Sequence, residues 1–313
     1  MGSPNDRIVL DHVAHAVVRW QDAWTRYAVD LGARWASGVS GGAGFSPAQL
    51  RFGNGARLEL LMPSRTESND FLARFLDRHG PGAHHVTFKV PDLDRAIDAA
   101  RTAGLTPIGI QRSDPAWQEA FLSPRQATGV VVQLAQAAGD WATEAPEDFP
   151  TSARTFSDGT PVPPAHLDLV VHAVARLDEG LALFAGLLGG TEVGRGEQDG
   201  VVWAELRWSG PLGLRLVAPA DDGLTNPLAS WIGGRSGRIH HLHLTAAEPD
   251  GVTGARPSGL PSVLSSPPLS APLASSVAPG SPRLDRSPSS ASPLEVPPEA
   301  NLGLRLVLTQ AEP

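Results

Sequence analysis

Hydrophobic and polar positions along the chain show one opening pattern four times, a short alternating run that starts a new unit. The four runs are LDHVAHAVV, GAHHVTFKV, HLDLVVHAV and RIHHLHLTA. In the first unit, residues 8–17 alternate as a strand does, and residues 20–32 carry apolar side chains at helical spacing up to Gly32. Three strand-like runs follow, ARWASGV, SPAQLRFG and ARLELLMP, separated by Gly, Asn-Gly and Pro. The pattern predicts a βαβββ unit.

The second unit has the same order. Residues 84–90 are predicted as a strand, residues 92–104 as a helix, and LTPIGIQ, WQEAFLSP and GVVVQLAQ as three strands. Polar residues stand at matching places, since His12 and Glu59 are 47 positions apart and His85 and Gln133 are 48 apart. Such spacing indicates an internal duplication. The two units are expected to form one cupped mixed sheet over residues 8–137.

The second half follows this plan less closely. Residues 138–164 are rich in Pro, acidic residues, Ser and Thr, and predict a linker. Residues 165–313 are predicted as a degenerate second module, which makes the whole chain an α+β protein of two modules. Four residues stand at the places of the matched polar set: Leu169, Arg215, His241 and Val307.

The last unit is interrupted by a Pro/Ser-rich segment. Residues 249–300 hold 12 of the 29 prolines, a density that opposes both a helix and a central strand. An irregular or disordered segment is expected there. A true insertion and a corrupted coding sequence both remain open explanations.

Composition narrows the classes of function. The net charge of −8 and pI of about 5.7 disfavour a nucleic-acid partner. Without cysteine the chain has neither a disulfide framework nor a thiolate metal site. No apolar run reaches membrane-spanning length and no signal pattern opens the chain, so a cytoplasmic protein without a membrane partner is expected. The expected partner is a small-molecule substrate, and a homodimer is an open option.

The matched polar set suggests a metal centre. His12, Glu59, His85 and Gln133 each lie on the first or last predicted strand of a unit, so a cupped sheet can bring them together. Two imidazoles, a carboxylate and an amide oxygen suit one divalent ion, with Zn, Ni, Co, Mn or Fe as options. Four further residues are candidates to line the substrate cavity: Arg57, Lys89, Trp117 and Phe121.

The first half resembles the vicinal oxygen chelate superfamily, which includes glyoxalase I, methylmalonyl-CoA epimerase, extradiol dioxygenases and bleomycin-binding proteins. LDHVAHAV, ARLELLMP, GAHHVTFKVPDLDRAIDAARTAG and GVVVQL are closest to epimerase-like members. The resemblance implies that His12, Glu59, His85 and Gln133 are the metal ligands, and it selects the second residue of the His pair. It also implies a lyase or isomerase that acts on an oxygen-chelating substrate, such as a 2-oxo acid, thioester or diol, through a metal-stabilised enolate. Gln133 departs from the pattern, since epimerase-like members carry Glu there, which leaves Glu59 as the candidate catalytic base.

Two other functions stay open. One is a metal-free antibiotic-binding protein of the bleomycin-resistance type, and the other is an Fe(II) ring-cleaving dioxygenase that uses His12, His85 and Glu59. The remaining histidines are expected to be structural. His84 is expected to face away from His85, while His15 and His172 are expected to be packing residues.

The second module is not expected to bind a metal. Leu169, Arg215 and Val307 replace three of the four matched polar residues. Arg215 is expected either to bind an anionic group or to pair with an acid.

Overall fold

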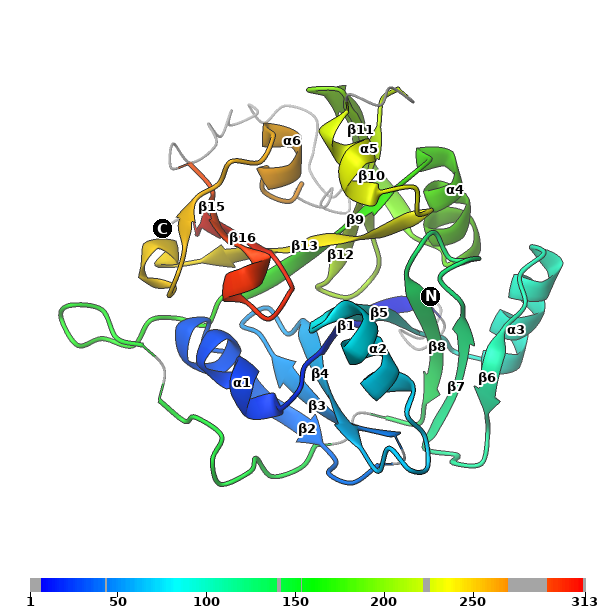
Figure 1. Ribbon diagram of the computed structural model, residues 1–313, viewed down its shortest axis with the longest axis horizontal. Helices are drawn as coiled ribbons and strands as arrows, with labels where there is room; N and C mark the ends of the chain where they lie inside the picture. Colours follow the sequence, from blue (N-terminus) through cyan, green and yellow to red (C-terminus); the bar gives the residue numbers. More distant parts are fainter. Residues whose placement is uncertain are drawn as a thin grey trace, which may run out of the picture.

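The computed structural model describes residues 7–42, 44–139, 142–152, 154–221, 226–269 and 292–311. These residues form two eight-stranded mixed sheets, one in the lower and one in the upper part of Figure 1. Three of the four units have the order βαβββ, and the fourth has a short 3₁₀ turn, Pro249–Gly251, in place of the first helix. The predicted α+β fold of two modules is confirmed.

The first module contains eight strands and three helices. Their bounds are β1 Val9–Ala16, α1 Trp20–Trp24, β2 Arg34–Gly38, β3 Gly44–Arg51, β4 Arg57–Ser64, α2 Phe71–His79, β5 Gly82–Lys89, α3 Leu93–Thr102, β6 Ile108–Gln111, β7 Trp117–Leu122 and β8 Val131–Ala137. The sheet order is β2-β3-β4-β1-β5-β8-β7-β6. The opening strands of the two units, β1 and β5, therefore pair antiparallel at the centre, with β4 and β8 parallel beside them.

The second module repeats this arrangement in the order β10-β11-β12-β9-β13-β16-β15-β14. Its elements are β9 His166–Val174, α4 Leu177–Leu181, β10 Thr191–Gln198, β11 Val201–Arg207, β12 Gly213–Pro219, α5 Pro227–Ile232, β13 Gly237–Ala246, β14 Arg256–Pro257, α6 Ser262–Ser265, β15 Leu294–Val296 and β16 Leu306–Gln310. Short 3₁₀ turns at Pro249–Gly251 and Pro298–Ala300 complete it.

The first helix of each module differs from the prediction of one regular α-helix over residues 20–32. One α-helical turn in α1 passes into a π-helical segment, Thr25–Asp30, and α4 does the same at Ala182–Leu187. The wider π turn is buried on its inner side, and it holds Tyr27 at the centre of the core with no exposed surface. The recurrence in both modules supports their common plan.

One hydrophobic core runs through both modules. Strand residues such as Leu58 and Phe88 pack beneath α1 and α3 and continue into the second module, where Phe88 contacts Phe184 and Trp208. The opposite face of the first sheet carries a smaller apolar cluster of Ala14, Ala16, Leu61 and Leu72 under α2. The first sheet therefore has one mainly apolar face and one face that can carry more polar residues.

The two modules also meet at a seam related by the duplication. His15 Nε2 donates to the carbonyl oxygen of Leu302 at 2.9 Å, and His172 Nε2 donates to that of Thr128 at 2.9 Å. Both carbonyls belong to residues of positive φ, 50° at Leu302 and 49° at Thr128. The interpretation of His15 and His172 as packing histidines agrees with these contacts, and each one bridges to the other module.

A glycine follows each of these turn residues and brings the backbones of the two modules together. A Cβ on Gly303 would lie 1.8 Å from the Pro81 oxygen, and one on Gly129 would lie 1.9 Å from the Gly237 oxygen. Only glycine fits such an approach, and both glycines also have positive φ. The seam is therefore built twice by the same device.

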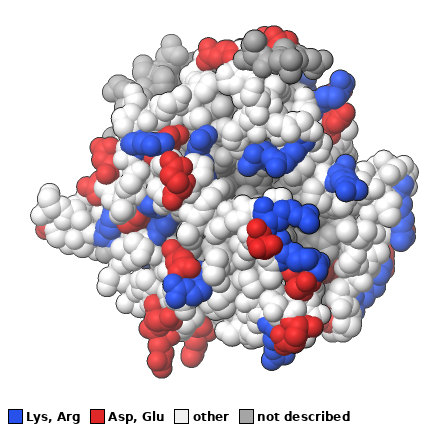
Figure 2. All heavy atoms as spheres, viewed as in Figure 1, with Lys and Arg blue, Asp and Glu red and all other residues white. Residues whose placement is uncertain are grey.

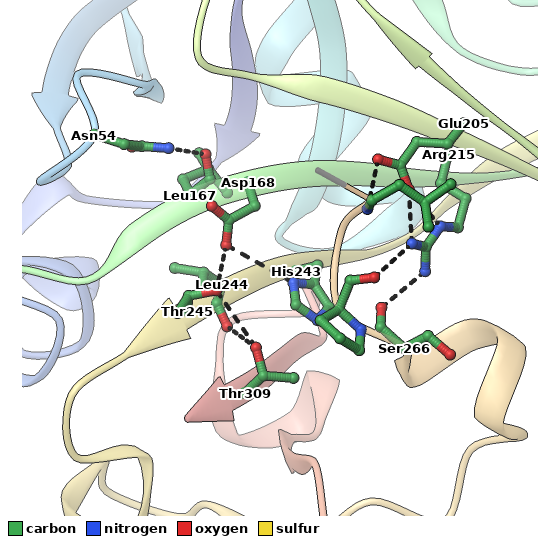
Figure 3. A network of polar contacts seen from close by, with 12 residues as sticks. Asn54, Leu167, Asp168, Glu205, Arg215, His243, Leu244, Thr245, Ser266 and Thr309 are labelled. Atoms are coloured by element: carbon green, nitrogen blue, oxygen red, sulfur yellow. Dashed lines mark hydrogen bonds and ion pairs between the residues drawn. The ribbon is translucent and has the colours of Figure 1, made fainter. Parts of the chain in front are cut away.

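The inner face of the second sheet is filled by its own chain. Leu169, Val171 and Val217 pack there against residues of α5 and α6. Arg215 pairs with buried Glu205 at 2.7 Å and donates to the carbonyls of Ser266 at 2.8 Å and Pro267 at 2.9 Å (Figure 3). Of the two expectations for Arg215, the structure shows pairing with an acid.

The Pro/Ser-rich segment contains more order than its proline content predicted. β14 and β15 pair as very short strands, and α6 forms one turn after Pro261. They form because β15 pairs with β16, which leaves Pro257 of β14 on the outer strand of the sheet. Residues 270–291 lie outside the described residues. Among the residues described, no helix has the length and apolar character needed to cross a membrane.

Candidate metal centre

Three of the four predicted ligands converge on the polar face of the first sheet. The ligand atoms of His12, Glu59 and His85 all lie within 4.8 Å of one another, and all three residues are buried. Glu59 Oε2 lies 3.7 Å from His12 Nε2 and 3.5 Å from His85 Nε2. Ligands around one ion at a bond length of about 2.1 Å are roughly 3.4 Å apart, so small inward movements would complete the site.

The strand register explains this convergence. Ala14 on β1 stands between Glu59 on β4 and His85 on β5, and His12 is two residues before Ala14 on the same face. Both imidazoles therefore project from neighbouring central strands toward the carboxylate. No described residue hydrogen-bonds to His12 Nε2 or His85 Nε2, although both atoms are buried. Such orphaned nitrogens fit a cation, because a buried polar atom without a partner is otherwise costly.

Asp11 orients His12 from a bulge in β1. Its Oδ2 accepts from His12 Nδ1 at 2.8 Å, so in the neutral imidazole Nε2 carries the lone pair. Burial opposes charge on His12, but Glu59 and Asp11 outweigh it and raise the pKa of His12 to about 9. The pKa of Asp11 lies below its usual value despite burial, because His12, Lys89 and Arg57 stabilise its charge. The pocket thus strongly favours a positive charge beside Glu59.

His84 occupies a different place from the one predicted. β5 has a bulge at this residue, since His85 pairs with Ala14 and Ala83 pairs with His15. The extra residue turns His84 to the same side as His85, where its ring contacts Phe71 and Phe75 of α2. The expectation that His84 faces away was therefore wrong, because strict alternation fails at a bulge.

His84 and His85 are hydrogen-bonded to each other. Their Nδ1 atoms are 2.9 Å apart, so one donates and the other accepts. Burial lowers the pKa of His84 to about 4, and burial with the charges on His84 and His12 lowers that of His85 well below its usual value. A neutral His84 accepts from His85 Nδ1–H, which leaves His85 Nε2 as a lone-pair ligand.

Gln133 lies on the adjacent strand and is held by two neighbours. Its Oε1 accepts from Thr87 Oγ1 at 2.5 Å, and its Nε2 donates to Glu119 Oε2 at 2.7 Å. Thr87 is also the register partner of His12, which sets Gln133 one strand beyond the histidine pair. The amide orientation is fixed, with its oxygen toward Thr87.

Glu119 is a polar residue of this face that sequence reasoning missed. It lies on β7, and its Oε2 also accepts from Trp117 Nε1 at 2.8 Å. The signal was present, because residue 119 has the same strand parity as the candidate lining residues Trp117 and Phe121. Glu119 therefore adds a carboxylate to the site face besides Glu59 and Asp11, one strand away from Gln133.

The four candidate lining residues lie on β4, β5 and β7. Arg57 and Lys89 approach Asp11 Oδ1, at 3.7 Å and 3.1 Å, so they help to hold the residue that orients His12. Trp117 and Phe121 are half-buried, and Phe121 is the register partner of Gln133.

The equivalent face of the second module is built differently. His240 and His241 repeat the bulge and the Nδ1 contact, at 2.7 Å, but Leu169 and Val307 bring no ligand and Arg215 is bound to Glu205. The second module therefore has the histidine pair but lacks the residues equivalent to His12, Glu59 and Gln133.

A comparison with family models places residues 11–141 in the glyoxalase/bleomycin resistance protein/dioxygenase superfamily. The first module belongs to this superfamily. The match spans most of β1 and all of β2 to β8. No curated protein sequence matches the chain.

Solved structures give two instructive similarities. A mutant of 4-hydroxymandelate synthase from Streptomyces coelicolor aligns over 77% of this chain and 71% of its own, with 15% identity and a TM-score of 0.55. This likeness shows the shared two-module fold. Methylmalonyl-CoA epimerase from Mycobacterium tuberculosis is 29% identical over 44% of this chain and 94% of its own, with a TM-score of 0.39.

Proposed function

We propose that the first module is a divalent-metal-dependent enzyme of the glyoxalase/epimerase type, a lyase or isomerase acting on a small oxygen-chelating substrate. The observation that carries this proposal is the pair of buried, unpartnered Nε2 atoms of His12 and His85 directed at Glu59 Oε2. His12, Glu59 and His85 would hold the ion, and the oxygen of Gln133 would be the fourth ligand. A bound divalent ion supplies Lewis-acid stabilisation of negative charge on substrate oxygens.

The chain's own residues would orient the ligands and move the proton. Asp11 and His84 hold the two ligand imidazoles in the tautomers that leave Nε2 free. A carboxylate then accepts the proton from a carbon next to a substrate carbonyl, while the C–H electron pair passes into an enolate. Glu59 is one candidate acceptor, although it would have to loosen its contact with the ion.

Glu119 is the second candidate acceptor, and it does not have this difficulty. Its Oε2 is fixed by Gln133 and Trp117, and no hydrogen bond to its Oε1 occurs among the described residues. It occupies the site face beside the position where Gln133 has replaced a carboxylate. We therefore include Glu119 in the proposed proton pathway.

An Fe(II) dioxygenase is the second candidate function. It is favoured by one observation, that the three converging residues are two histidines and one carboxylate, a set typical of non-haem iron oxygenases. Oxygen consumption with a catechol and ferrous iron would support it. A metal-free binding protein is less well supported, because such a protein needs no unpartnered imidazoles in its cavity.

Elemental analysis of the full chain tests the main proposal. After equilibration with Zn, Ni, Co, Mn or Fe and removal of the excess, the protein should retain about one ion per chain, as one site of this kind predicts. His85→Ala should lose the ion, whereas His241→Ala, the equivalent change in the second module, should retain it. A wild-type protein that binds none of these ions would refute the metal-dependent enzyme.

A further inference from the structure

A cleft with a volume of about 560 Å³ lies along the seam between the two modules. Its first-module wall includes the end of α2, the start of β5 and the turn before β8. Its second-module wall includes α5, the start of β13 and the start of β16. This seam cleft falls in the size range of small-molecule sites.

Four arginines line the seam cleft: Arg125, Arg235, Arg238 and Arg305. None of the described residues that line it is Asp or Glu, although the chain as a whole has a net charge of −8. Figure 2 shows Lys and Arg side chains gathered on both sides of a hollow near the middle of this face. The local charge is therefore opposite in sign to the charge of the protein.

These arginines differ in how far they are engaged by the protein itself. Arg125 and Arg235 are exposed, and neither forms an ion pair within the described part of the chain. Arg238 is half-buried and stacks over the Trp231 ring at 4.2 Å, which fixes its guanidinium against the wall. Arg305 has one acidic neighbour from outside the lining, since its Nε lies 3.7 Å from Glu295 Oε2. Two of the four charges are thus available to a ligand and a third is held in place.

Comparison of the two walls shows that most of this charge lies on the second module. The register of the central strands sets Arg238 at the place of Gly82, because each is paired with the matching Ala173 or Ala16. Arg305 in the same way takes the place of Val131. The duplicated backbone therefore forms a symmetric cleft, while the cationic groups gather on the wall of the module that lacks the ligand set.

The neighbouring titratable groups are affected by this charge. Burial and the charges on Arg78, Arg235 and Arg238 lower the pKa of His79, which lines the cleft. Burial and Arg235 lower the pKa of Arg238. Burial is the larger cause of both pKa shifts, and repulsion between the neighbouring cations acts in the same direction.

We propose that the seam cleft binds a phosphorylated small molecule of nucleotide size. Guanidinium groups bind phosphate oxygens through paired N–H donors, and the cleft offers four of them from both modules. The site is distinct from the metal centre, whose ligands His12, Glu59 and His85 do not line the cleft. The inner face of the second sheet is occupied by α5 and α6, so the second module would contribute to binding through its side of the seam cleft.

Titration calorimetry on the full-length protein tests this proposal with three probes, inorganic pyrophosphate, a nucleoside triphosphate and the neutral nucleoside. The nucleoside triphosphate should bind with one-to-one stoichiometry, and the neutral nucleoside should not. Arg125→Gln and Arg235→Gln should each weaken binding by about tenfold, because each removes one charge-assisted contact. Arg101→Gln, an exposed change on α3, is the matched control and should have no effect.

The His85→Ala variant separates this site from the metal centre. Phosphate binding should persist in this variant, and loss of binding would mean that the probe was held by the metal ion instead. Tighter binding of the nucleotide than of pyrophosphate supports the proposed ligand size, whereas binding of pyrophosphate alone would overturn it. Absence of binding by both phosphate probes, or equal binding of the neutral nucleoside, would overturn the proposal.

Discussion

The paired seam histidines make the stability of the protein sensitive to mild acid. Burial lowers the pKa of both His15 and His172 from 6.5 to about 4, and each neutral ring donates Nε2–H to a carbonyl of the other module. The unfolded chain binds protons at these residues below about pH 6.5, while the folded chain does not. Stability contributed by the neutral rings is therefore present above that pH and is lost as the pH falls toward about 4.

The size of this effect follows from the two pKa values. Between about pH 7.5 and about pH 5.0, each histidine should lower the free energy of unfolding by about 2 kcal/mol. Two such residues would remove about 4 kcal/mol, a large share of the roughly 5–15 kcal/mol that stabilises a typical protein. On acidification, protonation of the seam histidines should therefore lower the free energy of unfolding before most carboxylates titrate.

Urea denaturation of wild type and His172→Gln at both pH values measures the contribution of one residue. Glutamine keeps an amide donor for the Thr128 carbonyl but does not titrate, so the variant should lose about 2 kcal/mol less than wild type on acidification. His166→Gln, at an exposed histidine, should leave the difference between the two pH values as it is in wild type. If wild type and His172→Gln lose the same free energy, the buried histidine is not the source.

Three further outcomes are expected. Gly303→Ala should lower the free energy of unfolding, measured in urea, by at least about 2 kcal/mol, since its Cβ would lie 1.8 Å from the Pro81 oxygen. The control Gly104→Ala has a similar φ and open space around it, and should cost only about 1 kcal/mol. Equal costs for the two variants would contradict the seam argument. Glu205→Leu should cost about 3–5 kcal/mol by leaving buried Arg215 without its acid, and adding Arg215→Met should restore most of the loss; a double variant as unstable as the single one would show otherwise. Glu119→Gln should keep the bound metal but slow exchange of substrate-analogue protons about 100-fold, and an unchanged rate would exclude it as the proton acceptor.

The spacing of polar residues predicted that His12, Glu59 and His85 lie close together. His12, Glu59 and His85 converge because each lies on a strand that the duplicated order sets at the centre of the sheet. Simple alternation specifies which face of the sheet each strand residue occupies, and the duplicated βαβββ order indicates which strands are equivalent. This information is enough to bring together residues that are far apart in the sequence.

Local departures from alternation were not readable from the sequence. The bulge at His84 depends on pairing with β1, and the matching bulge at His240 depends on β9, so neither follows from the residues of one strand. Glu119 was missed for a related reason, because its bond to Gln133 depends on the lateral order of β7 and β8. Tertiary partners decide such details.

The packing of the chain onto the inner face of the second sheet could not be predicted from the sequence for another reason. α6 packs onto that face although it belongs to a segment whose proline content opposes regular structure. Arg215 fixes the segment through the carbonyls of Ser266 and Pro267, contacts that carry no sequence signature. Backbone acceptors are common to every residue, so composition alone does not reveal them.

The duplicated seam makes this chain its own dimer partner. The two related modules bury their surfaces against each other within one polypeptide, through equivalent histidine hydrogen bonds and equivalent glycine contacts. Because the two modules lie in one chain, their sequences can differ. One module can therefore lack the metal-ligand residues that the other carries. The result is a heterodimer encoded as a single gene product, in which one member can retain chemistry while the other is free to acquire a different recognition role.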